Sequence, residues 1–415
     1  MKVLFVTYGG GHVEMCLPVM RALREAQPGC EVQLLALTTA AAVARRAGEQ
    51  PLGLRDFCKG PEGERALRYG EQLIGNQQHP DVSREESLAY LGLNFIEWVD
   101  AVGEREAWSQ WREGGRHAFR PVKLMRRILS ELKPDVVVAT NSPRSEQAAL
   151  LAASTLGIPT LSMVDLFALP GDPYRERRVH ADRIAVLSEG TRRNLLEAGV
   201  PAERIVVTGN PAFDELAGAQ ASEAASQFRA ERGWGDRPVV LWAGHMEPAD
   251  ADARWAGAAL GQAVQDALLQ WTLAQPEACL AIRYHPNEWH RFTLPASHER
   301  VHWSQPDREP LLPVLAASDL VVVQATTVGA QAHAAGKQVL GLAFSPLVQR
   351  SGMDYGRLGL GTRVADLDAL PALVEQQLAA ARRDATSAGP RGTAAQQVAR
   401  EIAALAARRP QGHRA

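Results

Sequence analysis

A histidine follows a glycine run near the start of the chain, where it could act on a bound ligand. The run includes Gly10 and Gly11, precedes His12 and follows an apolar, β-branched stretch at 3–7 that predicts a buried parallel strand. The apolar spacing over 17–26 predicts a helix. In a strand–turn–helix unit the ligand binds at the carboxyl edge of the strand, where glycines let the backbone approach it and the helix start offers free N–H groups. We therefore expect His12 at a ligand site; capping of the helix by His12 is the structural alternative.

Polar residues also follow three predicted strands in the second half of the chain, at 239–243, 279–284 and 320–324. Histidines and an arginine supply positive hydrogen-bond donors to phosphate oxygens, and threonines at a helix start add hydroxyls and N–H groups. Each residue alone has a structural interpretation, such as an N-cap, but three loops at strand ends that meet at one edge predict a nucleotide site. The candidate donor-binding residues are Gly244, His245, Glu247, Arg283, His285, Pro286, Thr326, Thr327 and Gln331.

The bulk composition excludes several classes of protein. A chain of 415 residues predicts about two domains, and a formal charge of −2 argues against general nucleic-acid binding. The four cysteines are scattered without a Cys-x-x-Cys pair, which predicts neither a zinc site nor a disulfide framework and fits a reducing cytoplasm. We expect no secretory signal at the first strand and no membrane span.

Strands and helices alternate in two consecutive series, which predicts an α/β protein with two doubly wound parallel-sheet (Rossmann-like) domains facing each other across a cleft. We expect a first domain over 1–212, a second domain with the nucleotide site over 213–390 and a C-terminal helix and tail over 391–415, with the last residues disordered. The predicted strands are 3–7, 32–37, 136–140, 160–164, 183–187, 205–208, 239–243, 279–284, 301–303, 320–324 and 339–342.

The segment at about 61–127 departs from this alternation, because it shows helical patterns without convincing strands. Trp108 lies among basic residues that include Arg112, and such interleaving is compatible with an anionic acceptor or a membrane surface. A helical insertion with a solvated basic face is the alternative, which we prefer. Under the first interpretation Trp108 and Arg112 face the acceptor, together with Gly10, Gly11 and Asn141.

Several motifs resemble those of the two-domain nucleotide-sugar enzymes of GT-B architecture, a group that includes glycosyltransferases and UDP-N-acetylglucosamine 2-epimerases. The likeness to the epimerases runs through Leu-Lys-Pro-Asp-Val-Val-Val at 132–138, Val-Thr-Gly-Asn-Pro at 207–211, Gly-His at 244–245 and Gly-Lys-Gln-Val-Leu at 336–340. It covers most of residues 125–385 and implies the same architecture.

The departures from the epimerase pattern argue against that activity. The family's arginine in the first glycine turn is replaced by the sequence Gly10-Gly11-His12, and its acidic residue after a first-domain strand corresponds to Asn141. Its ribose-binding glutamate aligns with Gln331. Removal of a C2 proton needs well-placed acids and bases, and most of these positions differ.

The Gly-His-(five residues)-Pro sequence at 11–18 resembles the opening of many inverting glycosyltransferases. The resemblance implies that His12 is the general base, or sits beside the acceptor, and an imidazole is suited to take the proton of a sugar hydroxyl. Asp165 could orient His12. We therefore predict a glycosyltransferase that moves a sugar from a nucleotide-sugar donor to a hydroxyl of a glycan, lipid-linked or protein acceptor, in surface-glycan synthesis or glycosylation.

The donor nucleotide stays open between two possibilities. UDP is preferred, but His285-Pro286 also resembles a pair in transferases that use CMP-activated nonulosonic acids, and Gln331 weakens the UDP case. We expect no cofactor and no metal ion. We expect a cytoplasmic enzyme, with peripheral contact at the inner face of the membrane as an option. The rival functions are an epimerase or nucleotide-sugar hydrolase and a non-catalytic binding protein.

Overall fold

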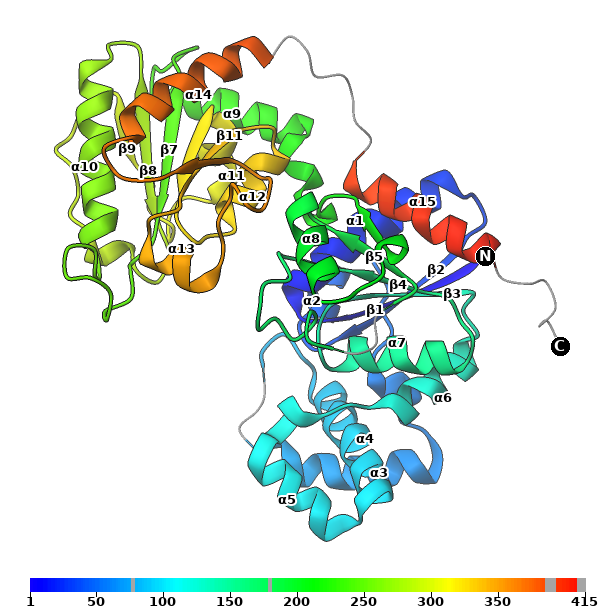
Figure 1. Cartoon of the computed structure of the whole chain (residues 1–415). Helices are drawn as coiled ribbons and strands as arrows, with labels where there is room; N and C mark the ends of the chain where they lie inside the picture. Colours follow the sequence, from blue (N-terminus) through cyan, green and yellow to red (C-terminus); the bar gives the residue numbers. More distant parts are fainter. Residues whose placement is uncertain (76–78, 178–180, 385–392, 409–415) are drawn as a thin grey trace. The chain divides into compact units, whose positions relative to one another are not determined.

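A computed structural model describes residues 1–75, 79–177, 181–384 and 393–408, which form two compact units (Figure 1). The first unit contains Met1–Leu187, Arg192–Ala212 and the described residues of Gly392–Ala415. The second contains Ser188–Thr191 and the described residues of Phe213–Arg391. Each unit has one parallel sheet of six strands with helices on its faces, so the predicted α/β class with two doubly wound sheets is confirmed. The predicted tail at 409–415 lies outside the described residues.

The sheet of the first unit has the strand order β2-β1-β3-β4-β5-β6, and all its strands are parallel. Its central strands read as continuous apolar runs because both faces are covered. The strands are β1 (Lys2–Tyr8), β2 (Glu31–Leu37), β3 (Val136–Thr140), β4 (Thr160–Met163), β5 (Arg183–Val186) and β6 (Ile205–Val207). The helices that flank or follow them are α1 (Gly10–Ala26), α2 (Ala40–Arg46), α6 (Val122–Leu132), α7 (Ser145–Thr155), α8 (Glu189–Glu197) and the C-terminal α15 (Ala394–Ala407).

Alternate residues of β1 pack into two different cores. Val3 and Phe5 join α1, α2 and α15 on one face of the sheet. Leu4 and Val6 join α6, α7 and a helical segment on the other face. This alternation places the residues that follow each strand at a common edge, where functional groups gather.

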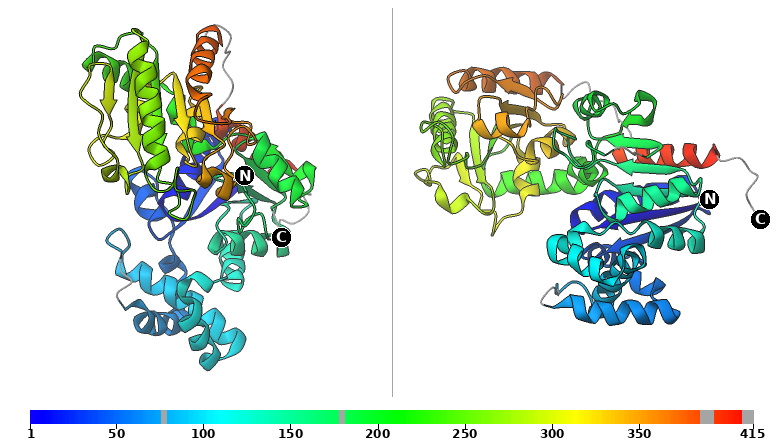
Figure 2. Two further views of the ribbon diagram at one scale, coloured as in Figure 1. Left: turned by 60° about the vertical axis from the view of Figure 1, so that its left-hand side comes forward. Right: turned by 60° about the horizontal axis from the view of Figure 1, so that its bottom comes forward.

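The segment at about 61–127 is helical, as predicted, and forms a separate bundle in all views (Figures 1 and 2). It consists of α3 (Gly60–Ile74), α4 (Arg84–Val102), α5 (Glu104–Gly114) and a short 3-10 turn, η2 (Gly115–Ala118), and leads into α6. The Ser83 hydroxyl accepts a hydrogen bond from the Glu86 N–H and so caps α4.

The sheet of the second unit has the order β12-β11-β10-β7-β8-β9, again all parallel. The strands are β7 (Val239–Gly244), β8 (Cys279–Tyr284), β9 (Val301–Trp303), β10 (Leu320–Val323), β11 (Gln338–Leu342) and β12 (Thr362–Val364). The helices are α9 (Ala219–Glu231), α10 (Ala259–Ala274), α11 (Leu311–Ala317), α12 (Val328–Ala334), α13 (Pro346–Ser351) and α14 (Leu370–Asp384). The sequence analysis missed β12, because three residues on a sheet edge leave little apolar pattern.

The C-terminal helix α15 belongs to the first unit, although the prediction set 391–415 apart. Its apolar residues Val398, Ile402 and Leu405 pack with α1, and α15 (red) lies against the strands of that unit in Figures 1 and 2. Within the described residues, no helix is both long and apolar enough to cross a membrane. The four cysteines are all free, as their scattered spacing predicts.

Helices α3 and α4 approach closely because glycines lie between them. A Cβ added at Gly92 would overlap the carbonyl group of Ala66, and one at Gly70 would overlap that of Leu88. Alanine is normally preferred over glycine within a helix by about 1 kcal/mol. At Gly92 the overlap with backbone outweighs this preference, since a backbone carbonyl cannot rotate away.

We therefore expect Gly92→Ala to destabilise the first unit by about 1–3 kcal/mol, the usual cost of overpacking. Thermal unfolding followed by circular dichroism should show a lower midpoint than the wild type. A midpoint that stays the same or rises would contradict the close packing of α3 and α4.

Candidate active site

The predicted residues of the first unit meet at the carboxyl ends of β1, β3 and β4, which are neighbours in the sheet. His12 follows β1, Asn141 follows β3, and Asp165 follows β4. The helix begins at Gly10 rather than at 17, so His12 lies in the first turn of α1 and not in a loop before it. Gly9 has a φ of 88°, a conformation that favours glycine, and makes the reversal from strand to helix.

The imidazole of His12 contacts polar groups through both nitrogens. Its Nδ1 lies 2.9 Å from the Thr140 hydroxyl and 3.3 Å from Oε1 of Glu146. Its Nε2 lies 3.5 Å from Oδ2 of Asp165. The predicted pairing of His12 with Asp165 is therefore present in the structure. A helix cap would need the side chain to bind the backbone N–H groups of α1, and the helix has no side-chain cap.

These contacts change the acid–base character of His12. Burial alone lowers the pKa of an imidazole, but the hydrogen bonds and charges of Asp165 and Glu146 outweigh burial and raise the pKa of His12 to about 9. Burial alone would raise the pKa of Asp165, whereas His12 and Asn141 bring it below its usual value. At neutral pH the pair is thus an imidazolium beside a carboxylate.

Glu146 is the main residue that the sequence analysis missed. Its side chain is fully buried in the first turn of α7. Its Oε1 accepts hydrogen bonds from the Tyr8 N–H (2.8 Å) and the Thr140 hydroxyl (2.9 Å). The available signal was an acidic residue at the start of an otherwise apolar helix that follows a buried strand. The epimerase pattern has an acidic residue where this chain has Asn141. Glu146, five positions later, is an acidic residue close to that place in the sequence.

A pocket of about 450 Å³ opens beside His12 and is also lined by Gly10, Gly11 and Asn141. The Asn141 amide donates a hydrogen bond to Oδ1 of Asp165 (2.9 Å), so it holds this carboxylate toward His12. Across the pocket, the Arg144 guanidinium lies 4.3 Å from the centre of the Tyr8 ring. The site therefore offers both signs of charge in a partly enclosed space.

In the second unit, the three loops that carry the predicted donor-binding residues follow β10, β7 and β8, which are also neighbours in the sheet. The rings of His245 and His285 lie 4.7 Å apart between centroids. Nδ1 of His245 lies 3.5 Å from Oε2 of Glu288, which also accepts a hydrogen bond from the Met246 N–H. Burial lowers the pKa of His245, and His285 lowers it further against the opposing charge of Glu288.

This cluster could hold a cation as well as an anion. His245, His285 and Glu288 each offer a ligand atom, and these atoms lie within 4.8 Å of one another. Two imidazoles and a carboxylate form a donor set suited to a borderline metal such as zinc. The two histidines equally suit phosphate oxygens once they are protonated, which is the role that the sequence analysis predicts.

Glu247 has a structural role, contrary to the prediction that it binds the donor. It is buried, and its Oε1 accepts hydrogen bonds from the Gln324 amide and the Ser345 hydroxyl (2.6 Å). Its Oε2 accepts one from the Leu347 N–H (2.7 Å). Gln324 in turn accepts a hydrogen bond from the His245 N–H (2.7 Å). Glu247 thus holds the loops after β7, β10 and β11 together.

The other predicted donor-binding residues differ in their exposure and in the contacts that they make within the protein. Arg283 donates hydrogen bonds to the Ser304 hydroxyl (2.6 Å) and the Glu309 carbonyl (2.9 Å), which ties it to the loop after β9. Gly244 ends β7, and a Cβ there would overlap the side chains of Trp242 and Tyr284. The residues left at the surface or partly exposed are His285, Pro286, Thr326, Thr327 and Gln331.

Trp108 is partly buried in the helical segment, and its contact with an acceptor stays a prediction. Its ring packs against the Phe95 ring, at 4.7 Å between centroids, and against the core under the helical segment. Arg112, on the same helix, is exposed. The periodic tryptophans therefore mark the core of the bundle, and the basic residues mark its solvated face, as the preferred interpretation expects.

Sequence comparisons connect the chain with enzymes that use nucleotide sugars. Residues 10–212 match the model of Glycosyltransferase Family 4. A segment of 110 residues is 32% identical to the UDP-N-acetylglucosamine–N-acetylmuramyl-(pentapeptide) pyrophosphoryl-undecaprenol N-acetylglucosamine transferase of Lactiplantibacillus plantarum, covering 26% of this chain and 28% of that protein. A segment of 98 residues is 36% identical to the UDP-N-acetylglucosamine 2-epimerase of Salmonella typhimurium, covering 21% and 26%. The chain thus spans less than a third of the length of the curated relatives it matches.

Solved structures match over nearly the whole chain. The UDP-GlcNAc 2-epimerase of Neisseria meningitidis, bound to UDP-GlcNAc, has a TM-score of 0.60 and 15% identity, with 99% of this chain and 100% of that chain covered. The epimerase of Methanocaldococcus jannaschii has a TM-score of 0.58 and 15% identity, with 97% and 100% covered. At this identity the likeness establishes the fold. The chain thus has the fold of the GT-B nucleotide-sugar enzymes and is similar in part of its sequence to members of that group, which includes glycosyltransferases and UDP-N-acetylglucosamine 2-epimerases.

Proposed function

We propose that the protein is a glycosyltransferase that moves a sugar from a nucleotide-sugar donor to an acceptor hydroxyl. The observation that carries the proposal is the contact of His12 with Asp165 and Glu146 beside a pocket at the carboxyl edge of the first sheet. The match of residues 10–212 to Glycosyltransferase Family 4 supports it.

In this mechanism the first unit activates the acceptor. The neutral form of His12 takes the hydroxyl proton while the acceptor oxygen forms a bond to the anomeric carbon, and the bond from that carbon to the nucleotide phosphate breaks. Asp165 and Glu146 stabilise the imidazolium that results. With a pKa of about 9, roughly one His12 in a hundred is neutral at pH 7, so the base is strong but scarce at that pH.

The second unit takes the donor in this proposal. His285, Thr326 and Thr327 supply hydrogen-bond donors to the phosphate oxygens, which gain negative charge as the nucleotide leaves. UDP is the preferred nucleotide, because the relatives from Lactiplantibacillus plantarum and Salmonella typhimurium are named for UDP-N-acetylglucosamine. A CMP-activated nonulosonic acid is the alternative. A lipid-linked acceptor is preferred over other glycans or a protein, since the first of these relatives is named for an undecaprenol-linked one.

The proposal places the reaction in surface-glycan synthesis in the cytoplasm, with a peripheral contact at the inner face of the membrane and without a metal ion or cofactor. A panel of nucleotides and nucleotide sugars, with binding measured by thermal shift, tests the donor class, since a ligand bound to the native state raises the unfolding temperature. Stabilisation by CMP and not by UDP would overturn the preferred donor.

Epimerisation of UDP-N-acetylglucosamine is the second candidate function. The specific observation in its favour is Glu146, which places a third ionisable group next to His12 and Asp165, where C2 proton removal would need acids and bases. Incubation with the donor alone separates the two: an epimer or free sugar supports the second candidate, and transfer that requires an acceptor supports the first.

Replacement of the proposed base should reduce turnover. We expect His12→Ala to lower kcat by about 10²- to 10⁴-fold at pH 9, the usual contribution of general-base catalysis. Donor affinity should stay close to the wild-type value in calorimetry, because the donor contacts are assigned to the second unit. A variant with near-wild-type kcat and a normal unfolding midpoint would exclude His12 as the base.

The pH profile tests which partner of the pair takes the proton. If neutral His12 is the base, kcat/KM rises tenfold per pH unit below about pH 9 and then levels off, because deprotonation of the imidazolium creates the active form. Asp165→Asn removes a carboxylate that raises the pKa of His12, so the midpoint should move to lower pH. A profile that falls above pH 9 would instead assign the base to Asp165.

A donor contact should be lost when His285 of the second unit is replaced. We expect His285→Ala to weaken nucleotide binding by about 1.5–3 kcal/mol, the scale of a hydrogen bond to a charged group. The same titration with and without EDTA distinguishes the two uses of the His245, His285 and Glu288 cluster. Unchanged affinity in the variant would reject the assignment, and loss of wild-type binding in EDTA would reject metal independence.

A further inference from the structure

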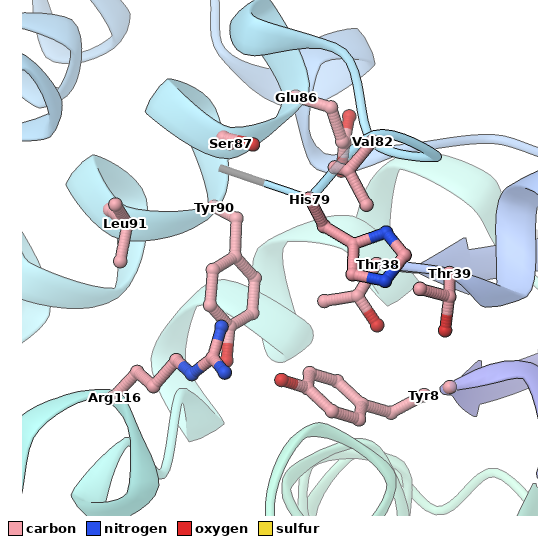
Figure 3. A pocket seen from close by; sticks show the side chains of 11 residues that line it. Tyr8, Thr38, Thr39, His79, Val82, Glu86, Ser87, Tyr90, Leu91 and Arg116 are labelled. Atoms are coloured by element: carbon pink, nitrogen blue, oxygen red, sulfur yellow. The ribbon is translucent and has the colours of Figure 1, made fainter. Parts of the chain in front are cut away.

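A second pocket of the first unit, of about 220 Å³, lies next to the His12 pocket and has no role in the mechanism above. It lies between the carboxyl ends of β1 and β2 and the helical segment, with α4 and η2 on the far side (Figure 3). It shares Tyr8 and Gly9 with the pocket of His12. A group bound in it would therefore be continuous with a hydroxyl presented to His12.

One buried polar group of this pocket is weakly satisfied. Tyr90 is 5% exposed, and among the described residues its hydroxyl has no hydrogen-bond partner of normal geometry; only the Tyr8 side chain interacts with it. Buried hydroxyls without a partner are uncommon, because losing water without a replacement costs about 1–3 kcal/mol. Burial also raises the pKa of Tyr90, so the hydroxyl keeps its proton and is a donor. It points toward the middle of the pocket (Figure 3).

The pocket also contains a cation that no described residue neutralises. The Arg116 guanidinium extends from η2 toward the hydroxyl of Tyr90, and the hydroxyl of Tyr8 points to the same space (Figure 3). Within the described part of the chain, Arg116 has no ion-pair partner. The acid in the wall, Glu86, is engaged elsewhere: its two oxygens accept hydrogen bonds from the N–H groups of Leu54 (2.8 Å) and Arg55 (3.1 Å).

The remaining wall combines apolar side chains with His79, Ser87 and two threonines, and it is close to the turn that precedes His12. The rings of Tyr8 and Tyr90 lie 6.0 Å apart and present flat faces, and Val82 and Leu91 complete that side. Thr39 accepts a hydrogen bond from the Gly10 N–H (3.1 Å), which ties the wall to the turn that carries His12. Thr38 has a φ of 57°, an unusual conformation for a β-branched residue that recurs where a binding surface is held in shape.

We propose that this pocket binds a carboxylated monosaccharide unit of the acceptor. A guanidinium and a buried phenol hydroxyl form a two-donor site for one carboxylate, and tyrosine faces pack against the C–H groups of a sugar ring. The volume is below that of pockets for drug-sized ligands, so it admits one ring and not a longer glycan. The proposal rests on the proposed function for its link to catalysis, but the binding itself requires no transfer.

The probe is methyl β-D-glucuronide, titrated into the full-length protein without donor and followed by ligand-observed NMR and calorimetry. We expect it to bind, and methyl β-D-glucoside and inorganic phosphate to bind at least tenfold more weakly. Arg116→Gln and Tyr90→Phe should each weaken glucuronide binding by about 10- to 100-fold, the range that loss of a hydrogen bond to a charged group gives. Arg105→Gln, an exposed arginine of α5, and Tyr69→Phe, on α3, are matched controls outside the pocket and should bind as the wild type does.

Three results would overturn the proposal: no glucuronide binding at millimolar concentration, equal binding of the glucoside, or full affinity in both pocket variants. Tyr90→Phe keeps the side-chain shape, so the test holds even if Arg116→Gln does not fold. Transfer to an acceptor without a carboxylate, together with absent glucuronide binding, would reject this pocket and leave the glycosyltransferase intact. Glucuronide binding in a protein that only epimerises its donor would reject the glycosyltransferase and leave the pocket.

Discussion

The buried carboxylate of Glu146 is the group on which the first site depends. A charge with no exposed surface must be paired and hydrogen-bonded, or its burial would cost several kcal/mol. Oε1 of Glu146 meets this need with the Tyr8 N–H at the end of β1, the Thr140 hydroxyl at the end of β3, and His12 on α1. Its Oε2 has no hydrogen-bond partner among the described residues. One side chain thereby fixes the mutual position of a helix and two strand ends, and it places His12 at the edge of the sheet.

The same pairing sets the chemistry of His12. Two carboxylates beside a half-buried imidazole hold it in the charged form, with a pKa of about 9. An imidazole chosen only as a base near neutral pH would be paired less strongly, because a second carboxylate raises the pKa beyond the working range. In the proposed mechanism both carboxylates stabilise the imidazolium that forms when His12 takes the proton.

The fold could be predicted from the sequence because apolar runs and glycine turns encode it locally. The runs at β1, β3, β7 and β10 carry the pattern of strands buried on both faces. All eleven predicted strands overlap strands of the structure. Contacts between distant segments carry no such local signal. The pairing of Glu146 with His12 joins residues 134 positions apart. Whether Trp108 faces solvent or the core depends on how α4 and α5 pack, which the local sequence does not show.

In each unit a buried glutamate holds together the elements that carry the candidate site residues. In the second unit Glu247 is buried and accepts hydrogen bonds from Gln324, Ser345 and Leu347, so it holds three loops at strand ends, as Glu146 holds three elements in the first. The structural role of neither glutamate was predicted from the sequence. Glu146 was overlooked, and Glu247 was assigned to the donor site. A buried glutamate after a parallel strand can therefore serve the framework that positions a neighbouring histidine. In the proposed mechanism His12 and His285, which stay partly exposed, are the groups that meet the acceptor and the donor.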